Sequence, residues 1–244
     1  MQTHQDWQYV QNQFQNALGR NYKATNIVAK DHVSTLANFK ADGDILVLYN
    51  RTLPVYNGFQ LAYTNWKKRV AFYKGATSAV DRLLEQFRTK LLPRWDVLIQ
   101  VFYMPDTAEY LTLVPSGRTG MYLGGKDSQI QAVRTLSESL LEYPDLASLQ
   151  EEVANFYANI EKARDIQQQR EQAVQGAADD LRKVQADVCL MMYRNLGRLM
   201  DKYAQEPQSI LNFYQLDLVR NVGAGSKAEE EEMMEIEPDM SSEG

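Results

Sequence analysis

The stretch from Phe59 to Leu91 decides the fold, and it reads FQLAYTNWKKRVAFYKGATSAVDRLLEQFRTKL. Apolar or small residues recur in it at steps that alternate between four and three without a break. This heptad pattern is typical of a helix that keeps one stripe against a partner helix. Pro93 predicts a stop or a kink at its end. The positions, here called the first seam, are Phe59, Tyr63, Trp66, Val70, Tyr73, Thr77, Val80, Leu84, Phe87 and Leu91.

A second run with the same spacing predicts a helix from Asp145 to about Gln205, ended by Pro207. At ~1.5 Å per residue this helix would be ~90 Å long, a length that suits an elongated bundle or a coiled coil. Its positions, here called the second seam, are Leu146, Leu149, Val153, Phe156, Ile160, Ala163, Gln167, Arg170, Val174, Ala177, Leu181, Val184, Val188 and Met191.

Gln167 and Arg170 are the two polar residues within the second seam. Polar residues at such positions cost stability and can fix the register or the oligomeric state of a coiled coil. Alternatively, they mark a point where the partner helix has ended.

The two seams predict an all-α fold, an elongated helical bundle with long antiparallel coiled-coil-like helices. Shorter helices are expected along them, among them one at Ser128–Glu142 and an amphipathic one after Pro207. A kink is expected at Leu53-Pro54. We expect residues 1–220 to form one elongated bundle domain. Residues 221–244 are expected to be a flexible linker and a disordered acidic tail.

The segment around residues 97–114 fits two structures. Val97–Met104 has a helical apolar face, but it is also rich enough in β-branched and aromatic residues to pair with Tyr110–Val114 as a hairpin. Asp106 and Glu109 alternatively fit the start of one helical turn. We expect a helix followed by irregular structure over about 104–127. The hairpin matters because an apolar hairpin at the tip of a bundle could touch a membrane.

The composition indicates a soluble globular protein, with 44% hydrophobic and 24% charged residues. No run approaches the ~18 apolar residues of a transmembrane helix, and the polar N-terminus does not resemble a signal peptide. Cys189 is the single cysteine, which excludes an internal disulfide framework. A cytoplasmic location is expected, and export by a route without a signal stays open.

The charge is distributed unevenly along the chain. The segment Ala228–Gly244 holds eight carboxylates and no lysine or arginine, and because the net charge is −6, the rest of the chain carries +2. This segment serves solubility or docks to a basic partner. The nearly neutral remainder and the short cluster Lys67-Lys68-Arg69 do not favour nucleic-acid binding.

Gly120–Ser128 looks like the start of a phosphate-binding loop, G-x-x-x-x-G-K. Such a loop continues with Ser or Thr and follows a buried strand, whereas here Asp127 follows Lys126 and no buried strand precedes. The glycines instead predict a turn, with Asp127 or Ser128 as the N-cap of the next helix.

A possible interaction loop contains Ser116, Gly117, Arg118 and Lys126, where an arginine beside glycines could bind an anion or a partner carboxylate. The alternative is that Arg118 is a solvated or ion-paired surface residue. No catalytic, cofactor-binding or metal site is predicted, and no cofactor is expected. The sequence offers no nucleophile–base pair and no E-x-x-H pair.

Several stretches carry a resemblance: Leu92-Pro-Arg-Trp-Asp96, Tyr110-Leu111, Pro115-Ser-Gly-Arg118 and Met191-Met-Tyr-Arg-Asn-Leu-Gly197. With these, the chain resembles a group of uncharacterised bacterial all-helical proteins over roughly residues 30 to 220. The group has no established activity, so the resemblance implies a helical fold and no site residues.

The function that the sequence favours is that of a non-enzymatic structural or protein-interaction bundle, which assembles with itself or a protein partner through its apolar seams. The alternative is a membrane-active, pore-forming-like bundle that inserts an apolar segment near residues 97–114. An enzyme with a site around Arg118 ranks last.

Overall fold

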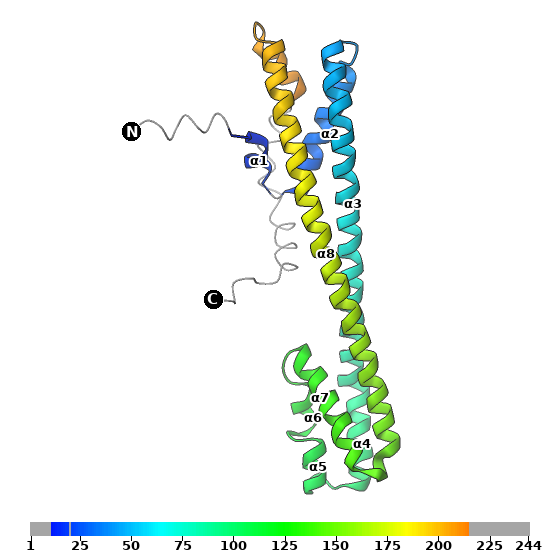
Figure 1. Cartoon of the computed structure of the whole chain (residues 1–244). Coiled ribbons are helices and arrows are strands. Elements are labelled where there is room, and N and C mark those ends of the chain that lie inside the picture. Colours follow the sequence, from blue (N-terminus) through cyan, green and yellow to red (C-terminus); the bar gives the residue numbers. More distant parts are fainter. Residues whose placement is uncertain (1–10, 20, 215–244) are drawn as a thin grey trace, which may run out of the picture. The chain divides into compact units, whose positions relative to one another are not determined.

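The computed structural model describes residues 11–19 and 21–214, and each secondary-structure element in these ranges is helical (Figure 1). The predicted all-α class is therefore confirmed. The predicted linker and acidic tail at 221–244 lie outside the described residues. The elements are α1 (Gln13–Leu18), α2 (Tyr22–Asn38), α3 (Gly43–Gln86), the π-helix η2 (Phe87–Leu91), α4 (Leu92–Phe102), α5 (Ala108–Leu113), α6 (Gly117–Tyr122), α7 (Lys126–Ser139), the 3-10 helices η3 (Leu140–Glu142) and η4 (Pro144–Leu146), α8 (Ala147–Lys202) and the 3-10 helix η5 (Pro207–Phe213).

Contacts within the chain divide it into two compact units. Unit 1 contains Met1–Arg69 and Ala173–Gly244, and unit 2 contains Val70–Gln172. The long helices α3 and α8 each contribute one part to each unit. The expectation of one elongated domain over 1–220 stays a prediction.

In unit 1, the beginning of α3 packs against the end of α8 in antiparallel fashion. Lys202 Nζ lies 2.9 Å from Asp42 Oδ1 and 2.8 Å from Asp44 Oδ2. Asp42 also starts α3, because its Oδ1 accepts the backbone N–H groups of Asp44 and Ile45. The hydrogen bond from Lys202 lowers the pKa of the Asp42 carboxyl. One cluster of charges thus caps α3 and ties it to the last turn of α8.

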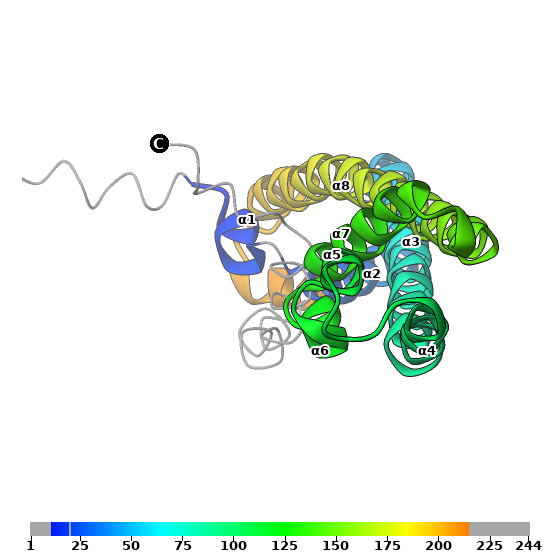
Figure 2. The same ribbon diagram turned by 90° about the horizontal axis from the view of Figure 1, so that it is seen from below.

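In unit 2, the rest of α3 runs antiparallel to the first part of α8. Gln167 Nε2 donates to Thr77 Oγ1 at 3.0 Å, and further along Trp95 Nε1 donates to Glu152 Oε1 at 2.7 Å. Phe87, Trp95 and Phe156 form an aromatic group in the core. The short helices α5, α6 and α7 lie together on one side of α3 (Figures 1 and 2).

The first seam is buried along most of its length, as the heptad pattern predicts. Tyr73, Thr77 and Leu91 are half-buried, and the other seven positions are buried. The second seam is likewise buried up to Leu181, apart from half-buried Ala163 and exposed Arg170.

Beyond Leu181 the predicted register of the second seam is wrong. The buried positions become Gln185, Val188, Met192, Asn195 and Leu199, with Cys189 buried beside them, whereas Val184 and Met191 are half-buried. The step from 181 to 185 repeats an interval of four, which corrects for the drift of a straight helix away from a strict seven-residue repeat. A search for apolar residues at heptad spacing misses this shift, because two of the buried positions, Gln185 and Asn195, are polar.

The chain stays helical at both prolines where the sequence predicts a kink or a stop. Helix α3 continues on both sides of Pro54, so no helix boundary lies at Leu53-Pro54. At Pro93 the helical path also continues, because η2 lies just before it and Pro93 falls in the first turn of α4. Proline is tolerated in a first turn, where its missing N–H has no intrahelical role. The wider i→i+5 turns of η2 join α3 to α4.

Residues 97–127 are helical to a greater extent than expected. The helix predicted after Val97 is confirmed by α4, whereas the hairpin alternative is wrong, because Tyr110 lies in α5. The expected irregular structure over 104–127 is also wrong, since it contains α5 and α6. The start predicted at Asp106 is displaced by one residue, to Thr107, whose Oγ1 accepts the Tyr110 N–H at 3.3 Å.

Helix α7 begins earlier than predicted. Its N-cap is Gly125, so the expectation that Asp127 or Ser128 caps it is wrong. Asp127 lies in the first turn instead, where a carboxylate interacts favourably with the helix dipole. The expected helical end at Glu142 is made by η3, and the expected helix after Pro207 is the 3-10 helix η5, which ends at Phe213.

Candidate functional site

The residues of the predicted interaction loop lie in unit 2, on α6 and at the start of α7. Ser116 precedes α6 without a side-chain cap, and Gly117 has φ +66°, a conformation that favours glycine. Lys126 Nζ lies 2.5 Å from Asp81 Oδ1 on α3. Arg118 is exposed. Lys126 therefore has a carboxylate partner within the chain, which weakens the case for this loop as an anion site.

The charge of Arg118 acts on Tyr110, whose hydroxyl donates to Asp96 at 2.7 Å. Burial and the hydrogen bond to Asp96 raise the pKa of Tyr110, and the Arg118 charge acts in the opposite direction.

Gln167 and Arg170 both contact α3 within unit 2. Gln167 is buried, donates to Thr77, and accepts from Arg164 Nη1 at 2.9 Å. The guanidinium of Arg170 lies 5.3 Å from the centre of the Phe72 ring. Since α3 lies beside both residues, the alternative that the partner helix has ended there is wrong. The Gln167–Thr77 bond joins the polar positions of the two seams, as a register-fixing pair would.

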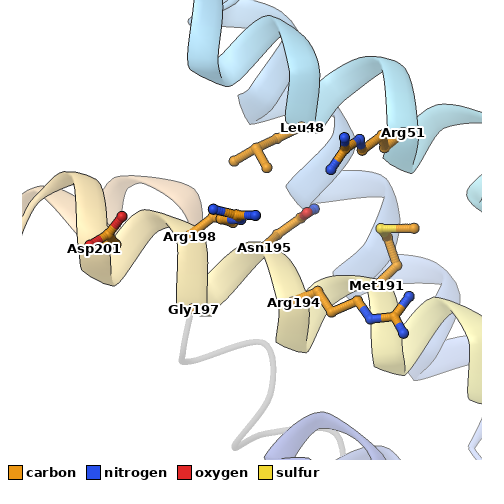
Figure 3. Close-up of a pocket in the computed structure, with 8 residues that line it drawn as sticks. All are labelled: Leu48, Arg51, Met191, Arg194, Asn195, Gly197, Arg198 and Asp201. Carbon is orange, nitrogen blue, oxygen red and sulfur yellow. The ribbon is translucent and has the colours of Figure 1, made fainter.

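A pocket of about 650 Å³ lies in unit 1 between the first part of α3 and the last turns of α8 (Figure 3). The α8 residues recur at helical spacing, which places them on one face of the helix. Helix α3 supplies two residues spaced by one turn. The residues lining this pocket, here called the arginine pocket, are Leu48, Arg51, Met191, Arg194, Asn195, Gly197, Arg198 and Asp201.

The charge of the arginine pocket is positive, because three arginines and one aspartate line it. Within residues 11–19 and 21–214, Arg51, Arg194 and Arg198 form no ion pair with a carboxylate. Lys202, next to Asp201 in sequence, is held by Asp42 and Asp44 instead. Guanidinium groups bind oxyanions through two parallel N–H bonds, so these arginines, unpaired among the described residues, offer donors for carboxylate or phosphate oxygens.

The wall of the pocket rests on a buried hydrogen-bond network centred on Asn195. Asn195 Nδ2 donates to Thr52 Oγ1 at 2.7 Å and to His32 Nε2 at 3.0 Å. Thr52 Oγ1 in turn donates to the Leu48 carbonyl at 2.7 Å. These bonds fix the Asn195 side chain and join α2, α3 and α8 directly behind the arginines.

The protonation state of His32 follows from its partners. His32 Nδ1 lies 3.1 Å from the carbonyl oxygen of Phe213, which can only accept, so Nδ1 carries the proton and Nε2 accepts from Asn195. The ring is fully buried, and burial lowers the pKa of His32 to about 4. A neutral imidazole is thus part of the structure at neutral pH.

Tyr214 completes this layer. Its ring stacks on the His32 ring at 4.5 Å between centres, and its hydroxyl donates to the Met192 carbonyl at 2.8 Å. Burial raises the pKa of Tyr214. Tyr214 is therefore held against His32, which itself accepts a hydrogen bond from Asn195 in the pocket wall.

Sequence patterns do not reveal the arginine pocket, because an arginine on a helix usually reads as a solvated residue. The available signal is the set of polar residues at helical spacing, Gln185 and Asn195, opposite Thr25 and His32. Gln185 Nε2 donates to Thr25 Oγ1 at 2.7 Å in the same buried layer. The stretch Met191–Gly197, which contributes to the resemblance above, supplies four of the eight lining residues.

A second surface feature lies on α4 in unit 2. The helix buries Leu92, Trp95 and Ile99 but exposes a second apolar face. Exposed apolar faces of this kind mark interaction surfaces. This face, here called the α4 apolar face, is formed by Val97, Leu98, Val101, Phe102 and the following Met104.

Comparisons with protein-family models, curated proteins and solved structures found no match to this chain. Within the part of the chain that the structure describes, no helix is both long and apolar enough to cross a membrane. In the same residues, no group of three or more His, Cys, Asp and Glu side chains could hold a metal ion.

Proposed function

We propose that this chain is a non-enzymatic interaction protein whose arginine pocket binds an acidic segment of a protein partner. The observation that carries the proposal is the set Arg51, Arg194 and Arg198, which line one pocket without ion-pair partners among the described residues. The apolar seams are buried within each unit. We therefore assign the interaction to this charged surface and not to the seams.

A peptide carboxylate run suits the pocket better than a single small anion. The arginines come from two helices, so successive carboxylates can each reach one guanidinium, while Leu48 and Met191 offer an apolar wall to side-chain methylenes.

The expected affinity is modest and depends on salt. Exposed ion pairs contribute roughly 0.2–1 kcal/mol each, so one pair is too weak to hold a partner and several pairs must form together. Salt screens these charges over a Debye length of ~10 Å at 0.1 M, and the length shortens as the ionic strength rises, which weakens the ion pairs further. The pocket therefore fits a transient partner.

The test uses the full chain and a fluorescein-labelled peptide of six glutamates, followed by fluorescence anisotropy at low salt. The double variant Arg51→Glu/Arg198→Glu is expected to weaken binding at least tenfold, because two attractive contacts become repulsive. Circular dichroism checks that this variant is folded, and Arg51→Gln/Arg198→Gln repeats the test with a smaller change.

The matched control is Lys23→Glu/Lys30→Glu, which makes the same charge change at exposed positions of α2 in unit 1. This control is expected to weaken binding less than threefold. Equal losses in both variants would show that only the overall charge matters, and the proposed site would then be wrong.

The α4 apolar face favours a second interaction, namely self-association. In a two-fold symmetric dimer the same patch meets itself, and an apolar helix face is complementary to a second copy of that face. Val101 and Met104, exposed by 72% and 70%, are its most exposed members.

A further inference from the structure

We propose that the chain's own acidic run, Glu229–Glu232, occupies the arginine pocket and competes there with an acidic partner. This inference rests on the proposed function and adds a regulator to the same site. The tail would act as a tethered competitor, so a partner would bind only when it displaces the run.

Charge complementarity is the first argument. The four consecutive glutamates lie in a segment, Ala228–Gly244, that contains no lysine or arginine. The pocket presents three arginines that have no carboxylate partner in the described part of the chain. Met233 and Met234 follow the run directly, and they match the apolar wall made by Leu48 and Met191.

The point at which the described chain ends is the second argument. Tyr214 stacks on His32, and His32 accepts a hydrogen bond from Asn195 in the pocket wall. Fourteen residues separate Tyr214 from Glu229. At ~3.3–3.6 Å per residue they can span up to about 50 Å, so chain length does not prevent the run from reaching the pocket.

Tethering makes weak contacts sufficient. A ligand on a short tether has an effective concentration on the order of 1 mM. If the free run bound with a Kd of about 0.1 mM, the tethered run would lower the apparent affinity of a competing partner roughly tenfold. Exposed ion pairs alone contribute too little for this affinity, so the contact of Met233 and Met234 with the apolar wall of Leu48 and Met191 has to add to it.

The competition test again uses the full chain and the hexaglutamate probe. The variant Glu229→Gln/Glu230→Gln/Glu231→Gln/Glu232→Gln is expected to bind the probe about tenfold more tightly than the wild type at low salt. The matched control neutralises four carboxylates of the same tail outside the run, with Glu235→Gln, Glu237→Gln, Asp239→Asn and Glu243→Gln. The control is expected to stay within threefold of the wild type.

The outcomes separate the two proposals. Equal probe binding by the wild type and the run variant would overturn the inference about the tail and leave the arginine pocket as a partner site. Absence of probe binding to either protein would overturn the proposed function as well. A similar gain in the variant and in the control would also overturn the assignment to Glu229–Glu232, since total tail charge would then explain the effect.

A direct readout is available through a nitroxide label on Met234→Cys. The native Cys189 is buried, and burial raises the pKa of its thiol to about 11, so the label reacts at position 234. Paramagnetic broadening is expected at the Asn195 and Gly197 amides and not at Gly176 on the same helix. It should disappear in Arg51→Glu/Arg198→Glu. Equal broadening at Gly176 and Gly197 would contradict docking in the pocket.

Discussion

At the scale of single residues, Asn195 and His32 show how unit 1 places polar groups in its core. Burial of a polar group costs free energy unless its hydrogen bonds are made, and here each bond of the Asn195 amino group goes to a defined acceptor. The network is therefore satisfied by only one tautomer of His32 and one orientation of the Asn195 amide.

His32 should make the stability of the protein depend on pH. Its folded pKa of about 4 lies below the ordinary value of 6.5, so between these values the unfolded chain binds a proton that the folded chain does not. The contribution of His32 to the free energy of unfolding is thus complete above pH 6.5 and is lost as the pH falls toward 4. Urea unfolding is expected to show about 2 kcal/mol less stability at pH 5 than at pH 7.5 from this group.

His32→Gln removes the titration, so this pH-dependent loss should largely vanish, although the variant is expected to be less stable at neutral pH. If the variant lost as much stability as the wild type between the two pH values, His32 would not be the responsible group.

Gly197 offers a second prediction at this scale. A Cβ atom at this position would meet no atom within 4 Å, yet glycine inside a helix costs about 1 kcal/mol relative to alanine. Gly197→Ala should therefore raise the free energy of unfolding by up to about 1 kcal/mol. Gly197→Leu should also fold but narrow the arginine pocket and weaken probe binding several-fold.

Gly176 provides the control, because it lies on the same helix, is also unobstructed, and is outside the pocket. Gly176→Leu should leave probe binding unchanged. Weaker binding in both leucine variants would mean that the pocket is not the binding site.

At the scale of the elements, the Gln167–Thr77 hydrogen bond joins α3 to α8 within unit 2. Gln167→Leu should destabilise the fold by about 1 kcal/mol, because Thr77 loses its partner at a half-buried position. Adding Thr77→Val should restore most of this loss. Urea unfolding of the two single variants and the double variant gives the coupling energy, and additive effects would show that the bond contributes nothing.

The long helices could be predicted from the sequence because the heptad spacing of their apolar residues continues over many turns, so a few irregular positions do not hide it. The shift after Leu181 could not, since Gln185 and Asn195 find their partners on helices far away in the chain. Helix α6 escaped prediction, and α5 was foreseen only as the alternative helical turn starting at Asp106. Each has six residues, fewer than two turns, and such a short segment shows no period.

The arginine pocket could not be predicted for a related reason. Arg51 and Arg198 are 147 positions apart in the chain, and only the packing of α3 against α8 brings them to one cavity. Lys126, which the sequence assigned to the interaction loop, lies beside Asp81 in the structure. No local sequence pattern predicts this contact, because the two residues are far apart in the chain.

At the scale of the whole molecule, the α4 apolar face predicts concentration-dependent self-association. Val101→Glu should shift the protein toward monomer in light scattering coupled to size-exclusion chromatography, because a buried carboxylate at a dimer contact is costly. Leu141→Glu is the matched control, since Leu141 is 69% exposed in unit 2 but lies outside the face. A wild type that is monomeric at high concentration would rule this interface out.

The two buried tryptophans among the described residues have a practical consequence. Trp66 belongs to unit 1 and Trp95 to unit 2, and they are exposed by 6% and 0%. Each unit thus carries its own fluorescent reporter once Trp7 is replaced by phenylalanine. Versions that keep only one of the two would let the melting of each half be followed by emission wavelength. Coincident melting curves would identify one cooperative folding unit, and separated curves would identify two.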